Sequence, residues 1–368
     1  MDMYAFRTLR GQPLRLALTV GGVASCIVLM FFLLAVYRGA ADGSVEYVRR
    51  NAADLWVLQK NASNILRGSS FVTAAQAEAV SRIPGVRSVA TVLLLLSTLQ
   101  KDGEDRTIFL AGYEPEKALG GPPELAQGRA VRTDGEIVLD AAFARKFGFK
   151  TGDPVDLQGR RLALVGLSRG TNAFVIQYAF VTLRFARTLV GIPGLATCFL
   201  VTAEAGADAD GIRDRIRSGF PALEAYRQSA FLANNIREMK SGFLPLLYTV
   251  AALGAVVLTV ILSLLLSVNI LERRKDFAVL KILGSPLRFL WGLVVRQAVL
   301  IASISEAEAL LVFFPLAAAI ERLAPEVSLK SSVGQILAVA LAVEFMSLAS
   351  SLVSIRRLRH IYYLEVFS

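Results

Sequence analysis

The stretch SGFLPLLYTVAALGAVVLTVILSLLLSVNIL, residues 241–271, holds 31 consecutive residues without a charged side chain, and ERRKD follows at once at 272–276. A helix rises about 1.5 Å per residue, so this stretch reaches roughly 46 Å. A bilayer core is only about 30 Å thick and needs about 20 residues. We therefore expect a membrane-spanning helix at 242–271 that continues outward as a stalk. The basic turn after it is typical of a cytoplasmic boundary.

The composition indicates a membrane protein that also has a water-soluble part. Apolar residues make up 54% of the 368, which is high for a soluble protein and low for a chain buried wholly in lipid. The net charge of +10 would suit nucleic acid, but the basic residues crowd the ends of apolar runs, so we expect no nucleic-acid partner. Cys26, Cys198 and the single His360 are far apart in the sequence, which predicts no disulfide framework, no metal site and no His-dependent triad.

Three further apolar runs are long enough to cross a bilayer, and we expect spans at 16–37, 289–320 and 331–355. The first lies between Arg15 and Arg38, where a cleaved signal peptide is the alternative interpretation. Its 22 uncharged residues exceed a usual signal core and lack a clear small-x-small cleavage site. An uncleaved anchor is therefore favoured.

The distribution of positive charge predicts the orientation of the four spans. Three segments, 1–15, 272–288 and 356–368, hold 11 Lys and Arg against four acidic residues, whereas the loop 321–330 is balanced. Lys and Arg concentrate on the cytoplasmic side of membrane proteins. We therefore expect these three segments in the cytoplasm and residues 38–241 on the outer side of the membrane.

The helix and strand patterns within residues 38–241 predict an α+β domain inserted between the first two spans. We expect two subdomains, 38–119 together with 196–241 as one and 120–195 as the other. The acids Asp102, Glu104 and Asp105 are most simply a solvated hairpin turn, and no catalytic constellation or Gly-rich phosphate loop is present. The expected helices are 73–80, 141–147 and 209–217, and the expected strands are 86–100, 136–139, 154–157, 161–167, 174–183 and 197–202.

Three local patterns carry a resemblance to a known family. ERRKDFAVLKILGS at 272–285 resembles the inner-loop pattern E-R-R-x-E-[IF]-[AG]-[IV]-L-[KR]-A-[LI]-G-A of the MacB/FtsX-like ABC transporter permeases. DAAFARKFGFKTGDPVDL at 140–157 resembles the outer domain of that family, and LEVF at 364–367 resembles its C-terminal ending, most like the DevC/HrtB branch of type VII ABC transporters. The departures are Asp276 for the usual Glu, Ile282 for a small residue, Pro286 after the motif, and Tyr363 where a proline-containing turn is common.

The resemblance implies a non-catalytic permease in the cytoplasmic (inner) membrane of a bacterial cell. It would work as a dimer with two copies of a separate ATPase, which would hold ATP and Mg²⁺. The chain itself would need no cofactor. Residues 272–288 would form a coupling helix on that ATPase, whereas a loop that meets only lipid headgroups is the alternative. Residues 1–15 would form an amphipathic helix on the inner membrane surface, or else a disordered tail. The coupling residues we expect are Glu272, Arg273, Arg274, Asp276, Phe277, Leu280, Leu283 and Gly284.

Four charged residues interrupt the third and fourth spans. A charged side chain within the bilayer is energetically costly, so its presence there indicates a functional role. Arg296, Glu306 and Glu308 fall in the third span, and Glu344 falls in the fourth. Glu306 and Glu308 are two residues apart and so cannot share one helix face. They predict a site for an amphipathic substrate. Hydrogen bonding between helices, or a watery position at the outer end of a span, is the alternative.

Small residues in the first span predict a packing seam. Gly21, Gly22 and Ser25 would allow a second helix to approach closely, as at a dimer interface. The resemblance implies export of a lipid, drug, peptide or haem-like molecule through mechanical transmission, with a membrane-fusion adaptor as a further partner. An FtsX-like signalling permease that activates an outer hydrolase, and a lipoprotein-extracting permease, are the competing functions.

Overall fold

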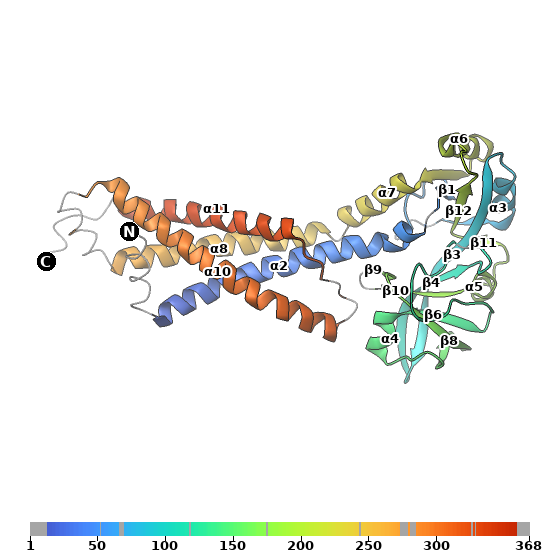
Figure 1. Cartoon of the computed structure of the whole chain (residues 1–368), viewed down its shortest axis with the longest axis horizontal. Helices are drawn as coiled ribbons and strands as arrows, with labels where there is room; N and C mark the ends of the chain where they lie inside the picture. The colour runs from blue at the N-terminus through green and yellow to red at the C-terminus, as the bar shows by residue number, and fades with distance from the viewer. Residues whose placement is uncertain are drawn as a thin grey trace. The chain divides into compact units, whose positions relative to one another are not determined.

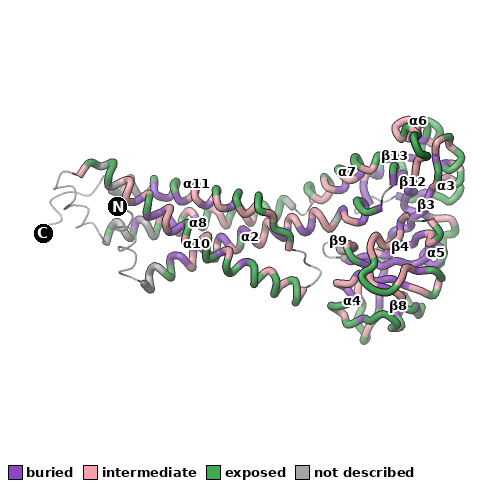
Figure 2. The backbone as a smooth tube through the Cα atoms, viewed as in Figure 1, coloured by how far each residue is buried: buried purple, intermediate pink, exposed green. Residues whose placement is uncertain are grey.

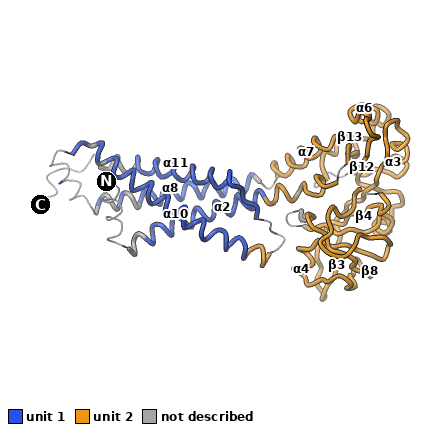
Figure 3. The backbone as a smooth tube through the Cα atoms, in the orientation of Figure 1, with its two compact units in different colours: residues 1–38, 245–319, 329–368 blue, residues 39–244, 320–328 orange. Residues whose placement is uncertain are grey.

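The computed structural model describes residues 13–51, 53–65, 70–117, 119–173, 176–242, 244–272, 279, 285–324, 327 and 329–358. The chain forms two compact units (Figure 3). A helical unit comprises residues 1–38, 245–319 and 329–368. An α+β unit, called here the outer domain, comprises residues 39–244 and 320–328.

Four long helices carry the candidate membrane spans (Figure 1). They are α2 (Pro13–Arg50), α8 (Leu244–Glu272), α10 (Leu287–Leu323) and α11 (Val333–Leu358). The apolar stretches long enough to cross a bilayer are Ala17–Gly43, Pro245–Leu264, Trp291–Leu323 and Val333–Leu352. The fold class predicted from the sequence, four spans with an α+β domain between the first and the second, is therefore confirmed.

Helix α2 is the most enclosed helix of the helical unit. Of its span, 56% is buried, against 11% for the span of α8. Its buried residues, among them Ile27 and Phe31, pack against apolar side chains of α8, α10 and α11 such as Leu258, Phe313 and Val343. Large apolar residues of the other three helices remain exposed, as lipid-facing positions require.

Polar contacts tie the C-terminal part of the first span to the start of the fourth. Arg38 donates from Nη1 to the hydroxyl oxygen of Ser332 at 2.6 Å, and the Lys330 N–H donates to the carbonyl oxygen of Ala35 at 3.3 Å. These contacts bring the end of one span and the beginning of another together. Both ends therefore lie on one side of the helical unit, as the charge distribution predicts.

The outer domain is built on an 11-stranded sheet whose main path runs β13-β1-β12-β3-β4-β10-β6-β8-β5 (Figure 1). Most strand pairs are antiparallel, whereas β10–β4 and β6–β8 are parallel. The elements in chain order are β1 (Leu55–Gln59), β2 (Val72–Thr73), α3 (Ala74–Ser81), β3 (Val86–Lys101), β4 (Glu104–Tyr113), β5 (Leu125–Gly128), β6 (Glu136–Asp140), α4 (Ala141–Phe147), β7 (Pro154–Leu157), β8 (Arg160–Ser168), β9 (Asn172–Ala173), β10 (Ile176–Thr182), α5 (Leu183–Val190), β11 (Leu195–Ala196), β12 (Cys198–Ala203), α6 (Ala209–Gly219), β13 (Leu223–Arg227) and α7 (Gln228–Ser241).

The long strand β3 belongs to both halves of the sheet. Its first half pairs with β12 and its second half pairs with β4 and β7. The predicted subdomain boundary at residue 119 needs correction, because β4 precedes it and yet lies in the half of the sheet that contains β6, β8 and β10. The division runs along β3, since a strand of 16 residues is long enough to serve two partners in succession.

Buried residues run along most strands of this sheet (Figure 2), and they fall into three cores. One core surrounds Trp56 and Phe180, and another surrounds Ile108 and Leu139. A third core lies beneath α3 and α6 and contains Val80 and Ile216. Two buried faces explain why several strands, such as LWVLQ in β1, read as continuous apolar runs and not as an alternating pattern.

Capping and turn residues in the sequence correctly predicted the positions of several elements. Helix α4 has the predicted bounds, because Asp140 caps its first turn and Gly148 ends it with a φ of 69°. Helix α3 begins after Thr73, which forms the expected cap. The hairpin β7–β8 turns at Gln158-Gly159, where both φ angles are positive.

One expectation about the long helices needs correction. Helix α2 does not end at residue 37 but continues to Arg50. The helix expected at 242–271 corresponds to α8, which runs without interruption from Leu244 to Glu272, and α7 ends before it at Ser241. Gly242, which lies between them, has φ −86° and ψ −97°, outside the helical region. The uncharged run 241–271 therefore lies almost wholly in one helix, and the interruption falls at its start.

Candidate functional site

The structure brings two of the four predicted intramembrane charges together. Glu344 on α11 accepts a 2.9 Å hydrogen bond from the Ser303 hydroxyl on α10. Glu306 on α10 is close enough to Glu344 to interact with it electrostatically, and its buried Oε1 atom has no hydrogen-bond partner among the described residues. We call Ser303, Glu306 and Glu344 the intramembrane polar cluster.

The other two predicted charges lie apart from this cluster. Glu308 and Arg296 are exposed in the isolated chain, although both lie on α10. The two glutamates of α10 therefore occupy different faces, as their spacing predicts. Of these two glutamates, Glu306 is the one with an electrostatic interaction with Glu344 of α11.

Buried serines add to the polarity of these helices, and the sequence-based interpretation missed them. Ser305 and Ser347 are fully buried, and their hydroxyl groups have no partner among the described residues. The Ser350 hydroxyl donates to the backbone oxygen of Thr259 on α8 at 3.0 Å. The available signal was their spacing, because serines at 347, 350 and 351 recur on one face of α11.

Of the predicted coupling segment, the structure describes Glu272, Val279 and residues 285–288. Glu272 is the last residue of α8. Arg273, Arg274, Asp276, Phe277, Leu280, Leu283 and Gly284 lie outside the described residues, as do residues 1–12 and 359–368. Their proposed roles remain predictions.

The predicted packing seam lies on an open face of α2. A Cβ atom added at Gly21 or Gly22 would meet nothing within 4 Å. Ser25 is exposed, and its hydroxyl donates to the Gly21 carbonyl at 2.8 Å. Leu18 and Leu29 on the same helical stripe are 71% and 44% exposed. No described residue covers this stripe, so a second helix could pack on it.

The last turns of α2 are anchored in the outer domain. The Tyr47 hydroxyl donates to the carbonyl oxygen of Gly120 at 2.7 Å, and the Gly120 N–H donates to Oδ1 of Asn51 at 2.7 Å. Gln228 Nε2 donates to the carbonyl oxygen of Val48 at 2.6 Å. Burial raises the pKa of Tyr47 well above its usual value, so this phenol stays a donor. The same helix thus carries a membrane span and a set of buried contacts in the outer domain.

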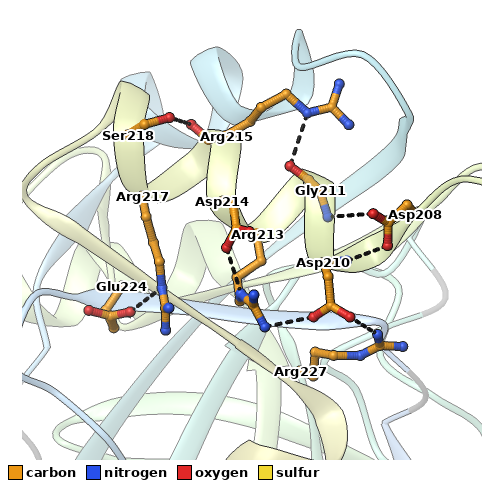
Figure 4. Close-up of polar contacts among 10 residues, drawn as sticks. All are labelled: Asp208, Asp210, Gly211, Arg213, Asp214, Arg215, Arg217, Ser218, Glu224 and Arg227. Carbon is orange, nitrogen blue, oxygen red and sulfur yellow. Dashed lines mark hydrogen bonds and ion pairs between the residues drawn. The ribbon is translucent and has the colours of Figure 1, made fainter.

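A dense charge network joins α6 to β13 (Figure 4). Arg213 contacts Asp210 at 2.6 Å and Asp214 at 2.9 Å, and Arg227 contacts Asp210 at 2.5 Å. The remaining ion pair joins Arg217 to Glu224. Because each of these carboxylates already has a basic partner, the network serves to hold α6 in place.

The described residues offer no metal centre, because no group of three or more His, Cys, Asp or Glu side chains comes together among them. Cys26 and Cys198 are both free thiols. Burial raises the pKa of Cys198, which makes it a poor nucleophile.

Two family models together match most of the chain. The MacB-like periplasmic core domain matches residues 16–218, more than half of the sequence, and the FtsX-like permease C-terminal domain matches residues 248–363. The chain belongs to the MacB/FtsX-like family of ABC transporter permeases. The two models match successive parts of the fold. The first covers α2 and most of the outer domain, and the second covers α8, α10 and α11.

Relatives of this permease occur in mycobacteria. It is 24% identical over 366 residues to an uncharacterised ABC transporter permease of Mycobacterium tuberculosis, covering 96% of this chain and 95% of the relative. It is 23% identical over 301 residues to one of Mycobacterium bovis, covering 81% of each.

Solved structures of outer domains are similar to part of the permease. The periplasmic region of MacB from Actinobacillus actinomycetemcomitans aligns with a TM-score of 0.39 and 13% identity, covering 49% of this chain and 90% of that one. The extracellular domain of the transporter YknZ from Gram-positive bacteria aligns with a TM-score of 0.36 and 15% identity, covering 48% and 99%. The family assignment rests on the sequence models.

Proposed function

We propose that this permease couples ATP hydrolysis by a separate ATPase to movement of its outer domain, and so exports an amphipathic substrate from the outer leaflet or the outer space. The proposal assigns both termini and residues 272–288 to the cytoplasm. The permease itself would be non-catalytic, with ATP and Mg²⁺ bound by two ATPase copies.

The observation that carries the proposal is the continuity of α2. It has 38 residues, begins before the first span and ends in buried hydrogen bonds of the outer domain. A continuous helix resists bending because each turn is hydrogen-bonded to the next. Tilting the span would therefore move the outer domain directly. The second connection, at Gly242 between α7 and α8, interrupts the helix and would act as a joint.

The proposed input is the segment 272–284, where Phe277, Leu280 and Leu283 recur at roughly helical spacing. This apolar stripe would dock on the ATPase while Arg273 and Arg274 meet an acidic rim. The proposed dimer seam is the exposed stripe of α2 that contains Gly21, Gly22 and Ser25. A second copy would cover this stripe.

The proposed substrate contact is the intramembrane polar cluster. A carboxyl group with a buried, unpartnered oxygen at membrane depth is costly, and such groups are retained for function. Glu306 meets this description and interacts with Glu344. A cationic or hydrogen-bonding group of an amphipathic molecule would satisfy that oxygen.

The first experiment measures ATPase activity of the permease with its cognate ATPase in lipid nanodiscs, across a panel of amphipathic compounds that includes haem. We expect one compound to stimulate the wild type and Glu306→Gln to abolish that stimulation. Glu308→Gln is the matched control, since this residue lies exposed on the same helix. No stimulation by any compound, with the complex intact, would favour the signalling or lipoprotein-extracting function.

The second experiment tests transmission through α2. Insertion of three glycines after Gly39 should leave basal ATPase activity intact and remove the stimulation by substrate. The same insertion after Ser241, where the helix is already interrupted, is the control and should have a smaller effect. Equal effects at the two sites would contradict a rigid role for α2.

A further inference from the structure

The outer domain contains a polar hollow of about 370 Å³. It opens where the parallel strands β4 and β10 end, since Tyr113 and Thr182 pair in register at their last residues. The chain then turns directly into α5, for which Thr182 is the N-cap. The lining residues are Tyr113, Glu114, Pro115, Glu116, Arg132, Asp134, Thr182, Leu183, Arg184 and Arg187.

This position favours an anion on general grounds. Crevices at the carboxyl ends of parallel strands are common ligand sites. The first turn of a helix also has N–H groups without partners inside the helix, and the peptide dipoles add a partial positive charge there. In α5 the Thr182 side chain accepts from the N–H of Phe185, which leaves the N–H groups of Leu183 and Arg184 at the hollow without partners within the helix.

Two of the three carboxylates in the lining are already neutralised. Glu114 contacts Lys117 at 2.9 Å and also accepts the Thr91 N–H at 2.8 Å. Asp134 forms an ion pair with Arg184 and accepts the Thr182 hydroxyl at 2.5 Å. These oxygens are therefore unavailable to a bound cation.

Two arginines of the lining have no carboxylate partner among the described residues. Arg187 is half-buried and donates from Nε to the carbonyl oxygen of Leu195 at 2.9 Å, which leaves its two NH₂ groups unused by any carboxylate. Burial lowers its pKa, with partial compensation from the charge of Glu114. Arg132 is exposed at the rim. Among the carboxylates of the lining, only the exposed Glu116 has no basic partner within the described residues. It is therefore the one carboxylate left to balance the charges of Arg132 and Arg187.

We propose that this hollow binds an oxyanion, a phosphate or carboxylate group, held by Arg132, Arg187 and the N-terminal N–H groups of α5. Guanidinium groups form paired, charge-assisted hydrogen bonds with such groups. The anion is either part of a small soluble molecule or the headgroup of a membrane lipid. The site does not depend on whether the permease exports a substrate.

The test uses the full-length permease in phosphatidylcholine nanodiscs and inorganic phosphate as the probe. Binding is measured by calorimetry at constant ionic strength, with chloride replacing phosphate so that screening does not change. The variants are Arg132→Gln and Arg187→Gln. Arg215→Gln is the matched control, because Arg215 also donates from Nε to a backbone oxygen, that of Gly211 at 3.0 Å, and lies on α6, outside the hollow.

We expect saturable binding in the wild type, a loss of about tenfold or more in affinity in each hollow variant, and no change in Arg215→Gln. Arg187→Lys should recover part of the affinity, which separates loss of charge from loss of structure. No saturation at tens of millimolar phosphate, or equal losses in Arg215→Gln, would overturn the proposal.

A change of lipid identifies the source of the anion. If phosphatidylglycerol in the nanodisc weakens phosphate binding in the wild type, the site takes a lipid headgroup. If phosphate binds equally well in both lipids, the site takes a soluble anion. Either result requires the phosphate binding that the proposal predicts.

Discussion

The hydroxyl of Tyr47, near the end of α2, donates a 2.7 Å hydrogen bond to the carbonyl oxygen of Gly120 in the loop that follows β4. The Tyr47 ring also stacks on Tyr178 with centroids 4.8 Å apart. The helix that carries the first span is thereby held inside the aromatic core of the outer domain. Its end cannot move without disturbing that core.

Tyr47→Phe tests this anchor, because it keeps the ring and removes the donor. The carbonyl oxygen of Gly120 would remain buried without that partner, so we expect the free energy of unfolding of the outer domain to fall by about 1–2 kcal/mol. Thermal unfolding of the full chain in nanodiscs, followed by Trp56 fluorescence in a Trp291→Phe background, measures it. The half-buried Tyr226→Phe is the control, and an equal shift there would contradict the anchor.

Glu136→Gln tests a charge cluster that depends on pH. Arg129 contacts both carboxylate oxygens of Glu136 at 2.8 and 2.5 Å, and the N–H of Arg132 adds a bond at 2.8 Å. These contacts, Arg129 foremost, lower the pKa of Glu136 to about 2. The folded pKa lies below the ordinary value, so the stabilisation is present above about pH 4.5 and disappears as the pH falls towards 2.

We therefore expect Glu136→Gln to lower the free energy of unfolding by about 1.5–3 kcal/mol at pH 7 and to weaken the loss of stability between pH 4.5 and 2. Unfolding curves recorded across this range provide the measurement. Glu204→Gln, at an exposed carboxyl, should leave both the stability and its pH dependence unchanged. A wild-type acid profile retained in Glu136→Gln would disprove the assignment.

Asp140→Ala tests the cap of α4. The buried Asp140 accepts N–H groups of Ala142 and Phe143 at 2.8 and 3.2 Å and the Thr171 hydroxyl at 2.6 Å. Its loss should cost about 2 kcal/mol in the free energy of unfolding, at the upper end for an N-cap. Asp140→Asn keeps a capping oxygen and should cost less. If both variants lose equal stability in the same thermal assay, the charge and not the cap is important.

Ser25→Cys tests the proposed dimer seam. In a Cys26→Ala/Cys198→Ala background, an exposed thiol on the stripe of α2 should form a disulfide with its copy in a second chain under mild oxidation. Gel electrophoresis without reductant detects the product. Leu264→Cys, also exposed and on α8, is the control and should remain monomeric. A crosslink at Leu264 and none at Ser25 would move the interface to α8.

Local chemistry made part of this fold predictable. The four spans follow from predominantly apolar runs of about 20 residues or more, because a helix of that length and composition can cross the bilayer core. Helix α4 and the β7–β8 hairpin follow from Asp140, Gly148 and Gln158-Gly159, which act on their immediate neighbours. The family motif at 272–285 also needed no structure.

Other features depended on partners distant in the sequence. The break between α7 and α8 lies at the start of the uncharged run 241–271, and composition alone does not show where one helix ends and the next begins. The extension of α2 to Arg50 is stabilised by Gly120 and Gln228, which lie far along the chain. The burial of α6 beside β13 likewise joins segments by packing and ion pairs.

The sequence by itself thus determined which segments enter the membrane, where the outer domain is inserted, and the family to which the permease belongs, because each depends on composition or on short motifs. Only the tertiary structure decided that Glu306 interacts electrostatically with Glu344 while Glu308 is exposed on another face, and that Arg132 and Arg187 line one hollow. The physical reason is that such contacts join residues tens of positions apart, and their formation depends on how whole helices and strands pack.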